Sequence, residues 1–209
     1  MEPAYFPALG WFVSSQWYRF VCGISGLGYS FKKQIQDVVG LEGNEVMADV
    51  GCGEGTFIAA LTEQYPHVRA HGFDPDPFLL REAASRVKTT NSRVTLEKAF
   101  AESLPRPSNY FDIAFFTFVL HHLTDIHKRK ALKEAFRILK PKGKLVITDF
   151  GPPLQRMHWP HLYLCEDMRL LRGCLEGRVA SMVTEAGFVV QSHRPFKADN
   201  ITLLIATKE

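Results

Sequence analysis

The stretch that decides the fold is VMADVGCGEG, residues 46–55. Its apolar run carries an acid, Asp49, and then breaks into glycines at positions 51, 53 and 55. Glycine occurs where the backbone turns sharply or passes close to a ligand, because it has no side chain to obstruct either. A buried strand that ends in such a turn and leads into a helix predicts a nucleotide-type binding site rather than an ordinary loop.

The spacing within this stretch argues against two common phosphate-binding sites. The dinucleotide fingerprint needs a third glycine at the position of Thr56, and a P-loop needs Gly-Lys-Ser or Gly-Lys-Thr, which does not follow. An acid beside a pyrophosphate would also hold two anions together in a partly dry crevice. Asp49 instead suits a ligand that bears an ammonium group.

A second acid follows the next predicted strand. Residues 71–73, HGF, lead into Asp74, after which Pro75 and Pro77 end the strand and open a helix. An acid about 20 residues beyond the first glycine is placed to accept the hydroxyls of a ribose. The predicted ligand therefore has a ribose and a cationic group, and no phosphate chain.

Strand and helix patterns alternate along the chain, which predicts an α/β fold with helices on both faces of a parallel sheet. Strands are predicted near residues 45–50, 68–73, 92–97, 111–117 and 143–149, with helices near 55–65, 77–87 and 126–139. Two β-rich runs, 187–194 and 200–207, predict a closing pair in which one strand is antiparallel.

Four stretches in this order resemble the class I S-adenosylmethionine-dependent methyltransferases, in the style of the quinone-biosynthesis C-methyltransferases and the small-molecule or phospholipid methyltransferases. They are VMADVGCGEG at 46–55, GFDPDP at 72–77, AESLPRPSNYFDIAFFTFVLHHL at 101–123 and RILKPKGKLVITDF at 137–150. The resemblance covers the chain from about Ser30 to Lys208. It implies a Rossmann-like three-layer sandwich with a seven-stranded, mostly parallel sheet whose last strand is antiparallel. It also implies S-adenosylmethionine as methyl donor and S-adenosylhomocysteine as product.

The resemblance further implies which residues hold the cofactor. They are Asp49, Gly51, Cys52 and Gly53 in the first loop, Asp74 and Pro75 after the second strand, Phe100, Ala101 and Glu102 after the third, and Phe116 and Thr117 at the fourth. In the family, an acid that binds the adenine amino group often stands where this chain has Phe100. Phe100 could pack on the adenine face, with the Ala101 amide on a ring nitrogen and Glu102 as the acceptor. The alternative is that Phe100 belongs to the core.

Methyl transfer from a sulfonium requires mainly alignment of donor and acceptor and exclusion of water. A general base is needed only where the acceptor loses a proton as it attacks. The candidates are His121, His122, His158 and His161, each of which could equally be a packed or solvated histidine. Asp112, at the start of the fourth strand, is expected to be structural.

Length and composition predict one domain over residues 1–209, since 209 residues with 46% hydrophobic residues form a single core. The resemblance implies that this is a methyltransferase domain. Its predicted parts are an N-terminal helical lid, 1–29, a cofactor-binding core, 30–150, a substrate-side insertion, 151–175, and a C-terminal helix and strand pair, 176–209. The lid and the insertion are rich in aromatic residues, which predicts an apolar, aromatic or lipid-like acceptor. An ordinary packed N-terminal helix is the alternative for residues 1–29.

The charge pattern predicts a small-molecule substrate and no nucleic-acid partner, because the net charge of +3 includes no long basic block. Gln16 and Arg19 interrupt the apolar run of residues 1–29, which is too short to span a bilayer. Peripheral contact with a membrane surface through this segment stays open, and liposome co-sedimentation would detect it.

The cysteines and the lack of a recognisable signal peptide predict a cytoplasmic protein, or one at the membrane periphery. Cysteines 22, 52, 165 and 174 show no paired metal spacing, so no metal is expected. His158, His161 and Cys165 could share a helical face as metal ligands, but Pro160 interrupts that run.

Two functional hypotheses remain from the sequence. The first is an active methyltransferase that acts on a small acceptor. The second is a cofactor-binding, non-catalytic relative that serves as a regulatory or partner subunit, which Phe100 and the Lys142 of the KPKGK turn would support. In that turn we expect Gly143 to supply the flexible position before the strand.

Overall fold

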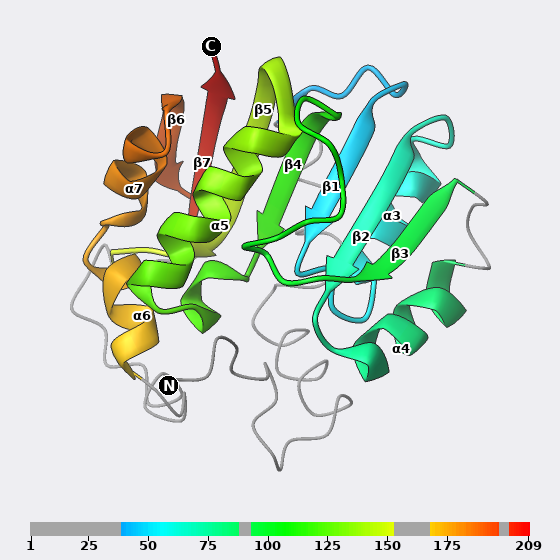
Figure 1. Ribbon diagram of the computed structural model, residues 1–209, viewed down its shortest axis with the longest axis horizontal. Coiled ribbons are helices and arrows are strands. Elements are labelled where there is room, and N and C mark those ends of the chain that lie inside the picture. Colours follow the sequence, from blue (N-terminus) through cyan, green and yellow to red (C-terminus); the bar gives the residue numbers. More distant parts are fainter. Residues whose placement is uncertain (1–38, 88–92, 153–167, 197–200) are drawn as a thin grey trace.

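The computed structural model describes residues 39–87, 93–152, 168–196 and 201–209, and Figure 1 draws the rest of the chain in grey. The predicted lid, residues 1–29, lies outside the described residues, as does most of the predicted insertion. His158 and His161 therefore lie outside them too. No helix among the described residues is long and apolar enough to cross a membrane.

The core of the molecule is a seven-stranded sheet with the strand order β3-β2-β1-β4-β5-β7-β6. The strands are β1 (Val46–Val50), β2 (Arg69–Asp74), β3 (Val94–Lys98), β4 (Phe111–Thr117), β5 (Leu139–Phe150), β6 (Phe188–Pro195) and β7 (Ile201–Lys208). The β1, β2, β3, β4 and β5 pairings are parallel, whereas β7 is antiparallel to both of its neighbours, β5 and β6. Figure 1 shows β7 pointing the opposite way from β1 and β4. The predicted sheet, with its one reversed strand, is confirmed.

Helices cover both faces of the sheet, as the alternating pattern predicts. They are α3 (Thr56–Gln64), α4 (Pro77–Val87), α5 (Asp125–Ile138), α6 (Met168–Leu175) and α7 (Val179–Glu185), with a short 3₁₀ helix, η1 (Leu120–His122), between β4 and α5. The apolar side of α3 packs on one face, where Phe57, Ile58 and Leu61 join a buried cluster with β1 and β4. Residues of α5 and α7 form the buried cluster of the other face.

Local sequence explains the central elements. Every residue of β1 is buried, as expected for a strand in the middle of a parallel sheet that is covered on both sides. Helix α5 begins after Thr124, whose side chain accepts a hydrogen bond from the backbone N–H of His127 at 3.4 Å. Its buried residues Ala131, Leu132 and Ala135 recur at helical spacing, so one stripe of the helix faces the sheet.

The KPKGK turn differs from the prediction. Lys142, and not Gly143, adopts the left-handed conformation, with φ of 66°. Gly143 is needed for close packing instead, because a Cβ there would lie 2.8 Å from the carbonyl oxygen of Lys140. Strand β5 thus begins at Leu139 and runs through the turn, with a register shift against β4. The expectation that Gly143 supplies the flexible position is wrong.

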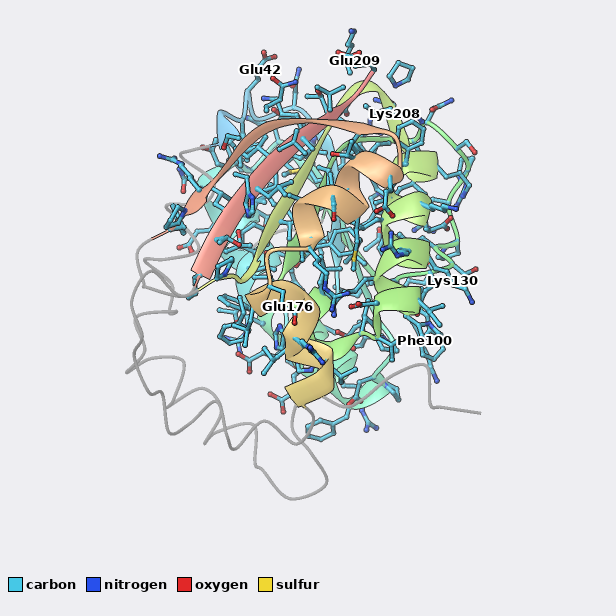
Figure 2. All side chains as sticks on the ribbon, turned by 90° about the vertical axis from the view of Figure 1, so that its left-hand side faces the viewer. Glu42, Phe100, Lys130, Glu176, Lys208 and Glu209 are labelled. Carbon is cyan, nitrogen blue, oxygen red and sulfur yellow. The ribbon has the colours of Figure 1, made fainter. Side chains whose placement is uncertain are left out.

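All the parallel strands end at the same edge of the sheet, because parallel strands share a direction. Asp49, Asp74 and Asp149 lie at or next to the ends of β1, β2 and β5. In Figure 2 Phe100, which follows β3, lies toward the lower end of the molecule, whereas Lys208 and Glu209 lie at the upper end. This edge is where open α/β sheets bind ligands.

Gly55 allows the turn after β1 to approach α4, and its replacement tests this packing. It has φ of 77°, and a Cβ would lie 2.8 Å from the Cβ of Ala83. We expect Gly55→Ala to lower the free energy of unfolding by about 3 kcal/mol, from left-handed strain and overpacking together. Gly40, with φ of 64° and no atom of the described residues within 4 Å of a Cβ, is the matched control.

Gly40→Ala should cost about 1 kcal/mol, from the backbone conformation alone. Urea denaturation of both variants measures the difference. Equal losses in the two variants would show that the contact with Ala83 does not constrain position 55.

Candidate functional site

The glycine turn after β1 is tied to the end of β2 by backbone hydrogen bonds. The N–H groups of Gly51 and Cys52 both donate to the carbonyl oxygen of Phe73, at 2.7 and 3.0 Å. The N–H of Gly53 donates to Oδ2 of Asp74 at 2.9 Å. The turn is therefore built onto the neighbouring strand.

Asp74 is the shared acceptor at this junction. Its Oδ1 accepts the backbone N–H of Asp76 at 2.9 Å, and the residue is only 6% exposed. Burial raises the pKa of Asp74, and the hydrogen bonds from Asp76 and Gly53 act in the opposite direction. A partly desolvated carboxylate gains from further donors, so Asp74 is suited to accept hydroxyl groups of a ligand.

Asp49 is buried one strand away, where it pairs in register with Gly72, two residues before Asp74. The thiol of Cys52 lies within the field of both acids. Burial, followed by the charges of Asp49 and Asp74, raises the pKa of Cys52 well above its ordinary value. Cys52 therefore stays a protonated thiol and is not a nucleophile.

The third contact region leaves Phe100 exposed. Phe100 is 44% exposed, so the alternative that it belongs to the core is wrong. Neighbouring Glu102 is engaged with α5, because its Oε1 lies 2.6 Å from Nδ1 of His127. Ala101 lies between them and is half-buried. An apolar ring is thus presented where the resemblance implies the adenine, while Glu102 already has one partner.

At the end of β4, Phe116 and Thr117 differ in exposure. The side chain of Phe116 is fully buried in the core, so it could meet a ligand only through its backbone, whereas Thr117 is half-buried. Asp112, at the other end of β4, accepts the N–H of Val46 at 2.9 Å and the ammonium of Lys140 at 2.7 Å. Its predicted structural role is confirmed.

The chain turns sharply between β4 and η1. Phe118 has φ of 57°, which is unusual for a bulky residue, and its N–H donates to the carbonyl oxygen of Thr148 at 2.8 Å. The next residue, Val119, packs against the glycine turn so closely that a Cβ on Gly51 would lie 2.5 Å from its Cγ2. Strained backbone of this kind occurs at functional sites, where the surrounding structure holds it in place.

This turn brings His121 to Asp149 at the end of β5. Nδ1 of His121 lies 2.8 Å from Oδ1 of Asp149. Asp149 also accepts backbone N–H groups from Leu120 at 2.7 Å and from Phe150 at 2.8 Å. Burial tends to raise the pKa of Asp149, but the interaction with His121 and the hydrogen bond from Phe150 outweigh it and lower the pKa.

His122 lies in a different environment from His121. Its ring centroid is 3.9 Å from that of His121. Removal from water, followed by repulsion from His121, lowers the pKa of His122 to about 3. His122 is therefore neutral at physiological pH. Of the candidate histidines described, His121 has the carboxylate partner.

Asp149 is the residue that sequence reasoning missed. The signal was present, because VITDF repeats the pattern of an apolar strand that ends in an acid, as at Asp49 and Asp74. The sequence does not reveal that Asp149 pairs with His121, because His121 follows β4 and lies 28 positions earlier in the chain. Among the described residues, no group of three or more histidine, cysteine or acidic side chains could hold a metal ion.

The chain is similar to known methyltransferases. A family model described as a methyltransferase domain matches residues 47–143. The ubiquinone/menaquinone biosynthesis C-methyltransferase UbiE of Yersinia enterocolitica is 32% identical over 135 residues, which cover 62% of this chain and 52% of that protein. The chain spans about half the length of the curated relatives it matches.

Solved structures share the fold. The [4+2]-cyclase SpnF is similar with a TM-score of 0.70 at 20% identity, over 86% of this chain and 81% of that one. A SAM-dependent methyltransferase from Aquifex aeolicus is similar with a TM-score of 0.68 at 21% identity, over 85% of this chain and 89% of that one. At these identities the likeness concerns the architecture.

The exposed ring of Phe100 gives a test of the predicted adenine contact. Stacking of a base on an aromatic side chain contributes about 1 kcal/mol or more, so Phe100→Ala should weaken S-adenosylhomocysteine binding by about fivefold or more. Val189 is also an exposed apolar residue but lies on β6, so Val189→Ala should leave the affinity unchanged. Isothermal titration calorimetry measures both, and equal affinities in the two variants would remove Phe100 from the site.

Proposed function

Because the chain carries a class I S-adenosylmethionine-dependent methyltransferase domain, we propose that it transfers the methyl group of this cofactor to a small apolar, aromatic or lipid-like acceptor. The observation that carries the proposal is the junction of the glycine turn with Asp74, where the Gly53 N–H meets the carboxylate at 2.9 Å. This junction brings the predicted ammonium-binding acid, Asp49, and the predicted ribose-binding acid, Asp74, to one edge of the sheet.

In this proposal each end of the cofactor meets a different part of the edge. Asp49 attracts the ammonium group of the methionine moiety, and the turn at Gly51 and Gly53 lets that moiety approach the backbone. Asp74 accepts the ribose hydroxyls. The adenine lies beyond them, between Pro75 and the exposed ring of Phe100, with Ala101 and Glu102 at its rim. The backbone at Phe116 and Thr117 borders the methionine moiety.

The chemistry that the cofactor supplies is an activated methyl group on a sulfonium. The acceptor attacks this carbon in line with the departing sulfur, and the protein contributes alignment and the exclusion of water. An acceptor that is already a neutral amine needs no base. A phenol or an activated ring carbon must lose a proton.

The relatives favour an acceptor that must lose a proton, such as an activated ring carbon. The name of the Yersinia enterocolitica relative describes C-methylation in ubiquinone and menaquinone biosynthesis. We therefore propose a carbon of a reduced, prenylated quinone ring as the acceptor. The aromatic residues of segments 1–29 and 151–175 would suit such a ring and its apolar chain.

A cofactor-binding protein without methyl transfer is the second candidate. It is favoured by the presence of the same fold in SpnF, which is a cyclase, and by Phe100 in place of the family's acid. The positive φ of Lys142 does not add to this case. That turn lies at the start of β5, whereas the site lies at its end.

Turnover separates the two candidates. We expect calorimetry to show binding of S-adenosylmethionine, and we expect tritiated methyl groups to appear in a 2-prenyl-1,4-naphthoquinone kept reduced with dithionite. Asp49→Asn, which removes the charge opposite the ammonium group, should weaken cofactor binding about tenfold and serves as the negative control. Binding of the cofactor without label in this acceptor or in a cell extract would favour the non-catalytic candidate.

A further inference from the structure

The pairing of His121 with Asp149 has the geometry of an oriented base. Asp149 is 1% exposed and its side chain accepts from four donors: the N–H groups of Leu120, His121 and Phe150, and Nδ1 of His121. These donors hold Asp149 as a carboxylate. A carboxylate can only accept from Nδ1, so Nδ1 of His121 carries the proton and the lone pair of the neutral ring lies on Nε2.

The ring of His121 is fixed on several sides. Phe150 meets it edge to face with centroids 4.9 Å apart, and Phe118 does so at 6.3 Å. His122 packs against it at 3.9 Å. The side chain is 10% exposed, and Nε2 has no hydrogen-bond partner among the described residues. The ring is thus held by Nδ1 and by its neighbours, while Nε2 makes no hydrogen bond to the part of the chain that the structure describes.

His122 on η1 is neutral, and on α6 burial raises the pKa of the Cys174 thiol, so that it is neutral as well. Asp125, Lys128 and Arg178 act on Cys174 and are not among the groups that shift the pKa of Asp149. Among the described residues, Asp149 is the charged side chain that contacts His121.

The pair is connected to the predicted cofactor loop through Val119. Val119, which begins the turn into η1, packs against Gly51 of the cofactor loop. His121 follows two residues later on the same short helix. Phe118, with φ of 57°, lies between the end of β4 and this helix. The need to place His121 gives a functional reason for the strained backbone of Phe118 in this turn.

We propose that His121 is the catalytic base of the methyl transfer and that Asp149 is the residue that positions it; this rests on the proposed function. An acceptor hydroxyl gives its proton to Nε2 of His121. The electron pair so released attacks the methyl carbon from the acceptor's oxygen or, through the conjugated ring, from its activated carbon. The bond between the methyl carbon and sulfur breaks, and its electron pair stays on sulfur as neutral S-adenosylhomocysteine. After attack from the activated carbon, that carbon also loses its hydrogen as a proton to water, and the ring oxygen takes up a proton, which restores the aromatic ring. The imidazolium then returns its proton to water.

Kinetics with the reduced 2-prenyl-1,4-naphthoquinone test the role of the base. His121→Gln should lower kcat about 100-fold, abolish the fall of kcat in acid that a neutral base produces, and change the calorimetric affinity for S-adenosylhomocysteine less than twofold. Asp149→Asn should lower kcat about tenfold. His193→Gln, on the exposed strand β6, is the matched control and should match the wild type. A His121→Gln variant that binds S-adenosylhomocysteine and keeps wild-type kcat overturns the proposal.

A second measurement does not depend on any acceptor. In ¹⁵N spectra of the histidine-labelled protein with S-adenosylhomocysteine, His121 should show a proton on Nδ1 and an unprotonated Nε2, assigned by comparison with His121→Gln. A proton on Nε2 of the neutral ring overturns the proposal even where the naphthoquinol is not a substrate. The predicted tautomer together with absent turnover would contradict the proposed acceptor, and the comparison of His121→Gln with the wild type would then use the acceptor that is labelled in a cell extract.

Discussion

The carboxylate of Asp74 is the point on which the site depends. It accepts the N–H of Gly53 from the turn after β1 and the N–H of Asp76 from its own strand's end. Because Asp74 is buried, these bonds form where water competes little. They hold the glycine turn against the end of β2, while the pairing of β1 with β2 sets the position of Asp49 relative to Asp74.

A second constraint acts across the sheet. Val119 packs on Gly51, and the N–H of Phe118 bonds to Thr148 on β5. The loop after β4 is therefore held between the glycine turn and β5. This arrangement couples the predicted cofactor loop to the pair of His121 and Asp149, because both adjoin the same short turn. The unfavourable φ of Phe118 is tolerated there since contacts on both sides hold it.

The features that the sequence predicted well are local ones. Asp49 and Asp74 follow apolar strands at a fixed spacing from glycine or proline, so their place at the edge of the sheet follows from adjacent residues. The exposure of Phe100 and the left-handed conformation of Lys142 depend on packing against other elements, and sequence patterns leave them open. The pairing of His121 with Asp149 joins positions 28 apart and requires β4 and β5 to be neighbours in the sheet. Alternation of strands and helices predicts a parallel sheet but leaves such pairs of side chains undetermined.

In the proposed function the edge of the sheet has one side for the methyl donor and another for the methyl acceptor. In it, Asp49 and Asp74 hold the methyl donor, as the family pattern implies, whereas we propose that His121 and Asp149 border the acceptor. The central claim is that Asp74 both holds the turn and receives the ribose, and calorimetry with S-adenosylhomocysteine tests it most directly. Asp74→Asn should weaken binding about tenfold or more, since hydrogen bonds to a charged group contribute about 1.5 to 3 kcal/mol, while Asp76→Asn should change it less than twofold. Equal affinities of the wild type and Asp74→Asn would contradict the claim.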